Sequence, residues 1–246
     1  MSAAGAMQLS VGRDRTVSVT VRRSARAQRL ILRLDQTGTV TLVLPLGVRD
    51  AEAQSFLKAH AGWLESRLEK VPERLAFAAD ATIPYRGVEH RIRHRPTGNP
   101  AQRRGVVWRE QPQEGLAEGP ELHIAGPAEH LPRRLTDWLK AEARRDLATR
   151  SRHYAAQLGR QVGRVTVRDT RSRWGSCSSK GDLSFCWRLI LAPDFVIDYV
   201  VAHEAAHLIE MNHSIRFWRL VDQLGVDRQR AQRWLKANGP RLHRYG

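Results

Sequence analysis

The 246-residue sequence has little cysteine and no long apolar run. Its only cysteines, Cys177 and Cys186, are too few for a disulfide-built secreted scaffold and lack the CxxC spacing of a metal or redox pair. No apolar stretch reaches the roughly 18 residues that a membrane-spanning helix needs. The first residues also lack the apolar segment of a signal peptide. We therefore expect a cytoplasmic protein with two reduced thiols, no membrane association and a short flexible tail over residues 1–15.

Lysine is scarce as well, although the chain is strongly basic. The formal net charge is +16, and only five of the 41 lysine and arginine residues are lysines. Such a charge is compatible with an anionic nucleotide or a nucleic acid as a partner. The excess is spread along the chain rather than gathered in one basic tract, however, which ordinary surface composition explains equally well. Aromatic-studded basic strands and zinc-ribbon cysteines, which read bases, are missing too.

The first part of the chain has the pattern of a β-rich domain. Residues 16–23 alternate at period two, and residues 29–34 and 39–45 flank the turn-rich tetrapeptide DQTG. These patterns predict a strand and a β-hairpin. Apolar residues at helical spacing then predict one helix from Asp50 to about Lys70.

A change of pattern near residue 126 predicts a domain boundary. Residues 82–125 hold short strand candidates separated by loops rich in proline, glycine and charge. From about residue 127 to 158 the apolar residues follow a helical stripe. We therefore expect a β-rich N-terminal part with one helix over 16–125 and a second part over 126–246.

The second part continues with alternating short elements. Residues 164–169 predict a strand, the polar and Gly/Ser-rich residues 170–182 predict a loop, and residues 183–192 predict the next strand. Pro193 suits the start of a helix, which we expect to run from about Asp194 to Met211.

That helix carries the motif HEAAH in otherwise apolar surroundings. His203 and His207 lie four residues apart, so they face the same way and can both bind one Zn²⁺. Glu204 points to the side, where it can take a proton from a water molecule that the metal activates. The motif predicts a zinc site with two histidine ligands and a general base. The alternative is an amphipathic helix with satisfied core histidines.

A third ligand is needed, and two residues are candidates. Glu210 lies on the same arc of a regular helix but about 10 Å along the axis from His203, so it is expected to support the site from outside. His213 comes after a predicted helix end, because Asn212 tolerates the left-handed conformation and Ser214 can cap the next helix. A reversal there would return His213 to the metal. Metzincins share this histidine count but have a glycine where this chain has Glu210.

At this point the sequence resembles a known family. The segments RWGSC, WRLILAP, HEAAH and MNHSIRFW occur in the order found in the YgjP-like metallopeptidase domain, which is related to the SprT-like zincins. The resemblance covers most of residues 16–235, and residues 95–120 match least. Ala205 and Ala206 stand where larger residues are common in the family.

The resemblance implies an α+β fold in which the β-rich part precedes a zincin-type core, with a small mixed sheet beside an active-site helix. It implies zinc as cofactor, His203, His207 and His213 as ligands, and Glu204 as the catalytic acid and base. A peptide or protein substrate follows from the same resemblance.

Two other functions stay open. A nucleoside triphosphate pyrophosphatase activity has been proposed in the same family, and the arginine-rich surface suits a triphosphate. The third hypothesis is a zinc-stabilised module that binds nucleic acid. A structural zinc site is closed by four protein ligands, whereas three histidines leave a position open for water, which favours catalysis.

Arg173 and Trp174 allow two interpretations. They either line the cleft, with Arg173 meeting a carboxylate or phosphate, or form a packing corner in which Trp174 covers the active helix and Arg173 pairs internally. We favour the packing corner. The remaining histidines are scattered, and each is expected to be structural or at the surface: His60, His90, His94, His123, His130, His153 and His243.

Overall fold

The computed structural model describes residues 4–12, 15–35, 38–69, 74–96, 106–111 and 119–246. Strands and helices are both present, so the fold is α+β, as expected. The chain divides into two compact units, residues 1–74 and 75–246. Each unit has its own cluster of buried apolar side chains, and the two clusters share no residue.

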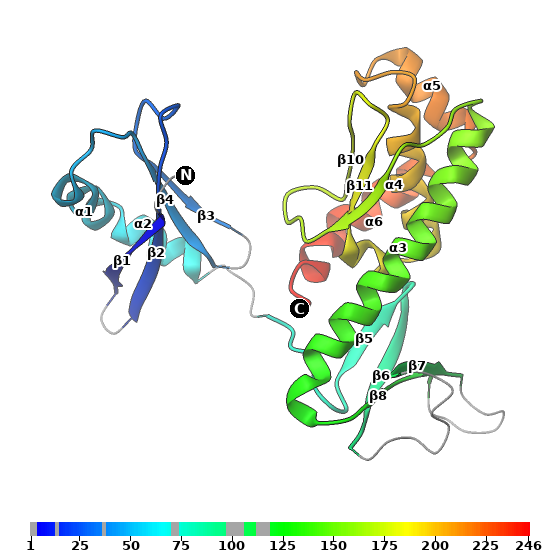
Figure 1. Cartoon of the computed structure of the whole chain (residues 1–246), viewed down its shortest axis with the longest axis horizontal. Coiled ribbons are helices and arrows are strands. Elements are labelled where there is room, and N and C mark those ends of the chain that lie inside the picture. Colours follow the sequence, from blue (N-terminus) through cyan, green and yellow to red (C-terminus); the bar gives the residue numbers. More distant parts are fainter. Residues whose placement is uncertain (1–3, 13–14, 36–37, 70–73, 97–105, 112–118) are drawn as a thin grey trace. The chain divides into compact units, whose positions relative to one another are not determined.

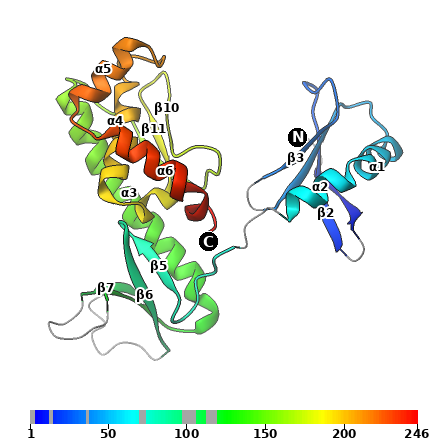
Figure 2. The ribbon, with the colours of Figure 1, turned by 180° about the vertical axis from the view of Figure 1, so that it is seen from behind.

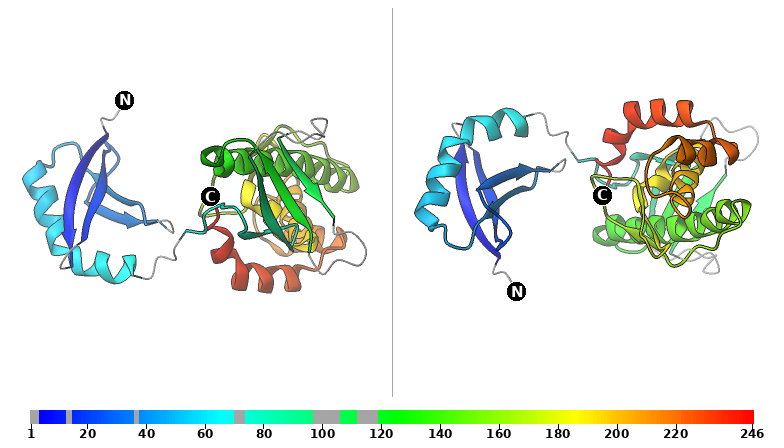
Figure 3. Two further views of the ribbon diagram at one scale, coloured as in Figure 1. Left: turned by 90° about the horizontal axis from the view of Figure 1, so that it is seen from below. Right: turned by 90° about the horizontal axis from the view of Figure 1, so that it is seen from above.

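The first unit is a four-stranded sheet covered by two helices (Figure 3). Its elements are β1 (Ala4–Val11), β2 (Arg15–Arg23), β3 (Ile31–Leu34), β4 (Val40–Leu44), α1 (Asp50–Ala59) and α2 (Ala61–Leu68). The strand order is β1-β2-β4-β3, with β2 and β4 parallel and the two outer pairs antiparallel. Apolar side chains of the strands, such as Val19 and Leu42, join Leu57 and Leu64 of the helices in one core.

The structure confirms the predicted strand β2 and the predicted β3–β4 hairpin. The prediction of a flexible tail is wrong for residues 4–11. Residues 4–11 form β1, which pairs with β2 along its whole length. Leu9 and Val11 alternate with exposed residues and enter the core. The small residues before them, SAAGA, do not show this alternation in the sequence. The helix expected from Asp50 is two helices, because it is interrupted at His60.

The second unit begins with another four-stranded sheet. Its strands are β5 (Thr82–Tyr85), β6 (Val88–Arg95), β7 (Val107–Glu110) and β8 (Glu121–Ala125), in the order β5-β6-β8-β7. A short 3₁₀ turn, η2 (Ala128–His130), leads into the 27-residue helix α3 (Leu131–Gln157). Figure 1 shows α3 passing this sheet at one end and the C-terminal elements at the other.

The C-terminal elements surround a small mixed sheet. They are β9 (Val165–Arg168), β10 (Gly175–Cys177), β11 (Leu183–Cys186), η3 (Trp187–Leu191), α4 (Asp194–Ala206), α5 (Ile215–Gln223) and α6 (Arg228–Leu242). The strand order is β10-β11-β9, with β10 antiparallel and β9 parallel to β11. Helix α4 packs beside this sheet, and α3 and α6 pack on α4 (Figure 2).

The unit boundary differs from the one expected at residue 126. It falls between Arg74 and Leu75, because the sheet β5–β8 packs on the first half of α3. Ile92 and Leu122 of that sheet share one buried cluster with Leu135 of α3. The helical pattern near residue 127 marks the start of α3 rather than a domain boundary, because the strands before it and the helix itself share one core.

Two further expectations need correction in the C-terminal part. The polar residues 170–182 contain a strand, β10, where only a loop was expected. The strand expected over 183–192 ends at Cys186 and continues as η3. The loops expected at 95–105 and 111–120 lie mostly outside the described residues.

Arg150 joins α3 to α4 through three carboxylates. Its guanidinium donates hydrogen bonds to Asp146 on its own helix (2.8 Å) and to Asp194 and Asp198 on α4 (2.6 Å each). Burial would lower the pKa of Arg150, but the hydrogen bonds to Asp198 and Asp146 raise it above its ordinary value. The side chain is 15% exposed, so the pairs are shielded from water more than surface pairs are. The network therefore fixes the position of α4.

Among the described elements, α3 is the longest helix, and it is too polar to span a bilayer. The shorter helices do not reach the length and apolarity that a membrane crossing requires.

The position of the boundary can be tested with two truncations. A chain of residues 75–246 should fold alone, with a cooperative thermal transition and dispersed amide NMR signals, because its apolar cluster is complete. A chain of residues 126–246 should not, because it exposes the half of α3 that covers the sheet β5–β8. Equal folding of both fragments would restore the boundary at 126.

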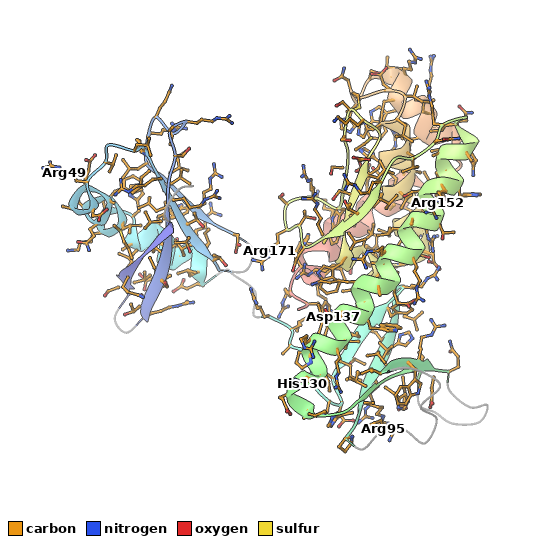
Figure 4. The ribbon with its side chains drawn as sticks, in the orientation of Figure 1. Arg49, Arg95, His130, Asp137, Arg152 and Arg171 are labelled. Carbon is orange, nitrogen blue, oxygen red and sulfur yellow. The ribbon has the colours of Figure 1, made fainter. Side chains whose placement is uncertain are left out.

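The Arg150 network can be tested by Arg150→Met. The change should destabilise the second unit by about 2 kcal/mol, since three carboxylates lose their shared partner while part of the network stays solvated. The matched control is Arg152→Met, two residues along α3, where the side chain is exposed (Figure 4). Differential scanning calorimetry measures both. A shift no larger for Arg150 than for Arg152 would show that the network does not hold α4.

Candidate metal and catalytic site

Helix α4 positions the residues of the HEAAH motif. Pro193 is its N-cap, as expected, and most of its side chains are buried. The helix ends at Ala206 with His207 as C-cap, five residues before the expected end at Met211. The chain closes it with tight bonds from the N–H groups of Leu208 and Ile209 to carbonyls three residues earlier (3.0 and 3.1 Å).

A reversal after α4 returns His213 to the helix. Ser214 caps α5, as expected, and its hydroxyl accepts a hydrogen bond from the N–H of Phe217 (3.3 Å). Asn212 does not use the left-handed conformation: within the described ranges, only Asp80 and Arg86 have positive φ among non-glycine residues. Its carbonyl instead accepts a bond from the N–H of Ser214 (2.8 Å).

The structure brings His203, His207 and His213 together. One ring nitrogen from each lies within 4.8 Å of the others, and the Nε2 atoms of His203 and His213 are 3.0 Å apart. Nitrogen ligands of a tetrahedral zinc ion lie about 3.4 Å apart, given bonds of about 2.1 Å. The three side chains therefore fit a metal ion with small adjustments.

The hydrogen bond of His207 orients its ring for a metal. Its Nδ1 lies 2.9 Å from the carbonyl oxygen of Glu210, and since a carbonyl only accepts, Nδ1 carries the proton. The lone pair then resides on Nε2, the arrangement common for metal-binding histidines. Glu210 thus supports the cluster through its backbone, while its carboxylate accepts a bond from the N–H of Asn212 (3.4 Å).

Burial also keeps the imidazoles of His203 and His207 neutral. Burial first, and then the positive charges that His207 and His213 would carry, lower the pKa of His203 to about 4. Burial likewise lowers the pKa of His207. The buried Nδ1 of His203 has no hydrogen-bond partner within the described part of the chain. Neutral imidazole is the form that binds metal ions, so His203 and His207 need no deprotonation at neutral pH.

Glu204 is buried beside the cluster, against strand β10. Its side chain is 6% exposed, and a Cβ atom built on Gly175 would lie 2.5 Å from its Oε1. Burial raises the pKa of Glu204 to about 7, while the positive charge of Arg173 acts in the lowering direction. The carboxyl group can therefore exchange a proton near neutral pH. Sequence reasoning did not single out Gly175. The one signal for it was its place in the segment RWGSC.

A cleft of about 320 Å³ opens at these residues. It is lined by Arg173, Trp174, Gly175, Tyr199, Val200, His203, Glu204, Gln232 and Leu235. Tyr199 and Gln232, which sequence reasoning did not single out, are joined by a hydrogen bond from the Gln232 amide to the Tyr199 hydroxyl (2.8 Å). The cleft gives a substrate access to one side of the histidine cluster and to Glu204.

Arg173 and Trp174 only partly fit the packing corner. Trp174 stacks on His243 (centroids 4.4 Å apart) and contacts Gly239 of α6. Arg173, however, is exposed and has no ion-pair partner in the described ranges, so the internal pairing is wrong. Both residues line the cleft.

The other candidates stay apart from the cluster. Within the described residues, the group of metal-ligating side chains contains His203, His207 and His213 and none of the seven scattered histidines. Cys177 and Cys186 are free thiols outside that group. Burial raises the pKa of Cys177 to about 11, with the nearby charges of Glu204 and Asp182 adding to the effect, so its thiol stays protonated.

Comparisons with known proteins bear on this site. The model of the YgjP-like family, metallopeptidase domain, matches residues 28–238. None of the curated proteins matches the chain significantly. Among solved structures, the metallopeptidase zymogen of Pyrococcus abyssi abylysin aligns with 24% sequence identity over 40% of this chain and 97% of that chain, with a TM-score of 0.35.

The family match spans both units of the fold and includes the HEAAH helix, the RWGSC strand and the loop of His213. The chain therefore belongs to the YgjP-like family and carries its metallopeptidase domain.

Proposed function

We propose that the protein is a zinc-dependent peptidase of the zincin type, with His203, His207 and His213 as metal ligands and Glu204 as general base. One observation carries the proposal: three imidazoles converge beside a buried carboxyl group at an open cleft. The mixed sheet beside α4 is in keeping with a zincin core.

The donor set favours zinc over harder cations. Three imidazole nitrogens suit Zn²⁺, whereas Mg²⁺ and Ca²⁺ prefer oxygen ligands. Three protein ligands also leave a fourth position for water, as in catalytic sites. When bound, zinc supplies a Lewis acid that polarises the peptide carbonyl and makes water more acidic.

Glu204 supplies the proton transfers. Its carboxylate accepts a proton from the attacking water and then donates it to the leaving amine. Both steps need a group whose pKa lies near the working pH, and burial raises that of Glu204 in this direction. Gly175 leaves room for the carboxylate, so the side chain is held beside the cleft rather than displaced from it.

The two free thiols fit a reducing compartment, so we propose a cytoplasmic setting. A peptide or protein is the proposed substrate. Triphosphate hydrolysis and nucleic-acid binding remain the competing functions, and the activity test below separates them from peptide cleavage.

The ligand assignment predicts about one zinc ion per chain after dialysis, measured by inductively coupled plasma mass spectrometry. The double variant His203→Ala, His207→Ala should lose it, and His213→Ala should bind zinc at least tenfold more weakly because only two ligands remain. His153→Ala, an exposed histidine on α3, is the control and should keep full occupancy. Full zinc content in the double variant would contradict the assignment.

The base assignment predicts that Glu204→Gln keeps its zinc and loses peptidase activity by roughly 10² to 10⁴-fold. Glu129→Gln, at an exposed glutamate of η2, is the control and should retain activity.

Peptide digestion is assayed beside pyrophosphate release from nucleoside triphosphates. Chelator-sensitive turnover of triphosphates alone would replace the peptidase by a phosphoanhydride hydrolase. Salt-insensitive, sequence-selective DNA or RNA binding by Glu204→Gln, without turnover by the wild type, would favour the binding module.

A further inference from the structure

A second pocket, of about 470 Å³, adjoins strand β10. It is lined by Arg164, Thr166, Arg168, Arg173, Ser176, Cys177, Ser178, Asp182, Leu183 and Ser184. Most of these residues are polar or charged. The HEAAH motif does not include them, and the proposed chemistry does not use them.

A row of hydroxyl groups crosses the sheet at this pocket. Ser176 of β10 pairs with Ser184 of β11, which pairs with Thr166 of β9. Because successive side chains of a strand point to opposite faces, these three share the outer face. The inner face carries Leu183 and Phe185, which are buried in the core. The outer face is therefore lined with hydrogen-bond donors.

Arginines surround this row with an excess of positive charge. Arg168 of β9 and Arg164, the residue just before that strand, lie two residues to either side of Thr166 and line the same pocket. Asp182 is the one acidic lining residue, and it lies 3.8 Å from Arg164. Arg168 and Arg173 have no ion-pair partner within the described residues. Two arginines thus remain available for an anionic group.

The pocket adjoins the catalytic cleft. Arg173 lines both, and its charge reaches Glu204. Between them lies β10, whose Gly175 faces Glu204 and whose Ser176 lines the pocket. Strand β10 is at the edge of its sheet, with no strand paired to its other side in the described part of the chain.

An extended peptide beside such an edge would direct alternate side chains to the two faces. One side chain would enter the cleft, where Trp174, Val200 and Leu235 offer apolar surface. The neighbouring side chain would reach the outer face, with its hydroxyl row and arginines.

We propose that this outer-face pocket is a specificity subsite for an aspartate or glutamate side chain of the substrate, next to an apolar residue that occupies the cleft. The inference rests on the proposed peptidase function and names its substrate class. A single carboxylate matches the pocket better than a triphosphate does, because the carboxylate of Asp182 in the wall would repel several added negative charges.

The test uses the zinc-loaded full chain and a library of peptides whose cleavage sites are read by mass spectrometry. The best-cleaved peptide is then made in two forms, with glutamate or with the neutral isostere glutamine at the acidic position. We expect kcat/KM to be roughly 10-fold higher for the glutamate peptide, mostly through KM, and the preference to shrink with added salt.

Arg168→Gln should bring the ratio between the two peptides close to one, and Arg168→Glu should favour a lysine peptide over the glutamate peptide. The control is Arg152→Gln, an exposed arginine of α3 outside the pocket, which should keep the wild-type ratio (Figure 4). Unchanged zinc content and melting temperature show that each variant is folded.

Four results would overturn the subsite. Cleavage without a glutamate preference, or a preference that survives Arg168→Gln, would do so while leaving the peptidase function intact. Competitive inhibition by inorganic triphosphate that depends on Arg168 and exceeds that of the acidic peptide would assign the pocket to phosphate. If the zinc-loaded protein cleaves no peptide at all, the peptidase function fails and the subsite fails with it.

Discussion

A carboxyl group buried in an apolar helix is the most demanding feature of this fold, and the elements around α4 are arranged to hold it. Glu204 is nearly inaccessible to water, and ionising it there costs free energy that its surroundings only partly return. The raised pKa of Glu204 is the measure of that cost. The same burial keeps His203 neutral, so one apolar environment prepares both the base and the metal ligands.

Holding these groups in place requires a helix that cannot shift. On one side, Arg150 ties α4 to α3 through Asp194 and Asp198. On another, Gly175 lets strand β10 approach so closely that a methyl group there would collide with the carboxylate. After the helix, the Ser214 cap and the carbonyl of Glu210 fix the turn and the ring of His207. None of these contacts uses the Nε2 atom of His207, which therefore stays free to bind a metal ion.

Much of this site could be predicted from the sequence, because its signals are local. The spacing of HEAAH fixes two imidazoles on one side of a helix regardless of tertiary context. Ser214 marks a helix start through its own hydrogen bond. The return of His213 depended only on a chain reversal between these two signals, although the reversal does not use the conformation expected of Asn212.

The features that were missed depend on contacts distant in sequence. Strand β1 contributes Leu9, Val11 and the partly buried Met7 to a core that β2 and the helices complete. The boundary at residue 75 reflects packing of β5–β8 on α3, which no local pattern encodes.

Strand β10 is the most instructive of the missed elements. Its residues Gly175, Ser176 and Cys177 resemble a loop because neither face shows the usual apolar alternation. On one face, an apolar side chain would collide with Glu204, so glycine stands there. On the other, a hydroxyl continues the row formed with Ser184 and Thr166. The sequence of β10 thus lacks the usual strand pattern because the strand adjoins both pockets. The missing apolar alternation is a consequence of the site.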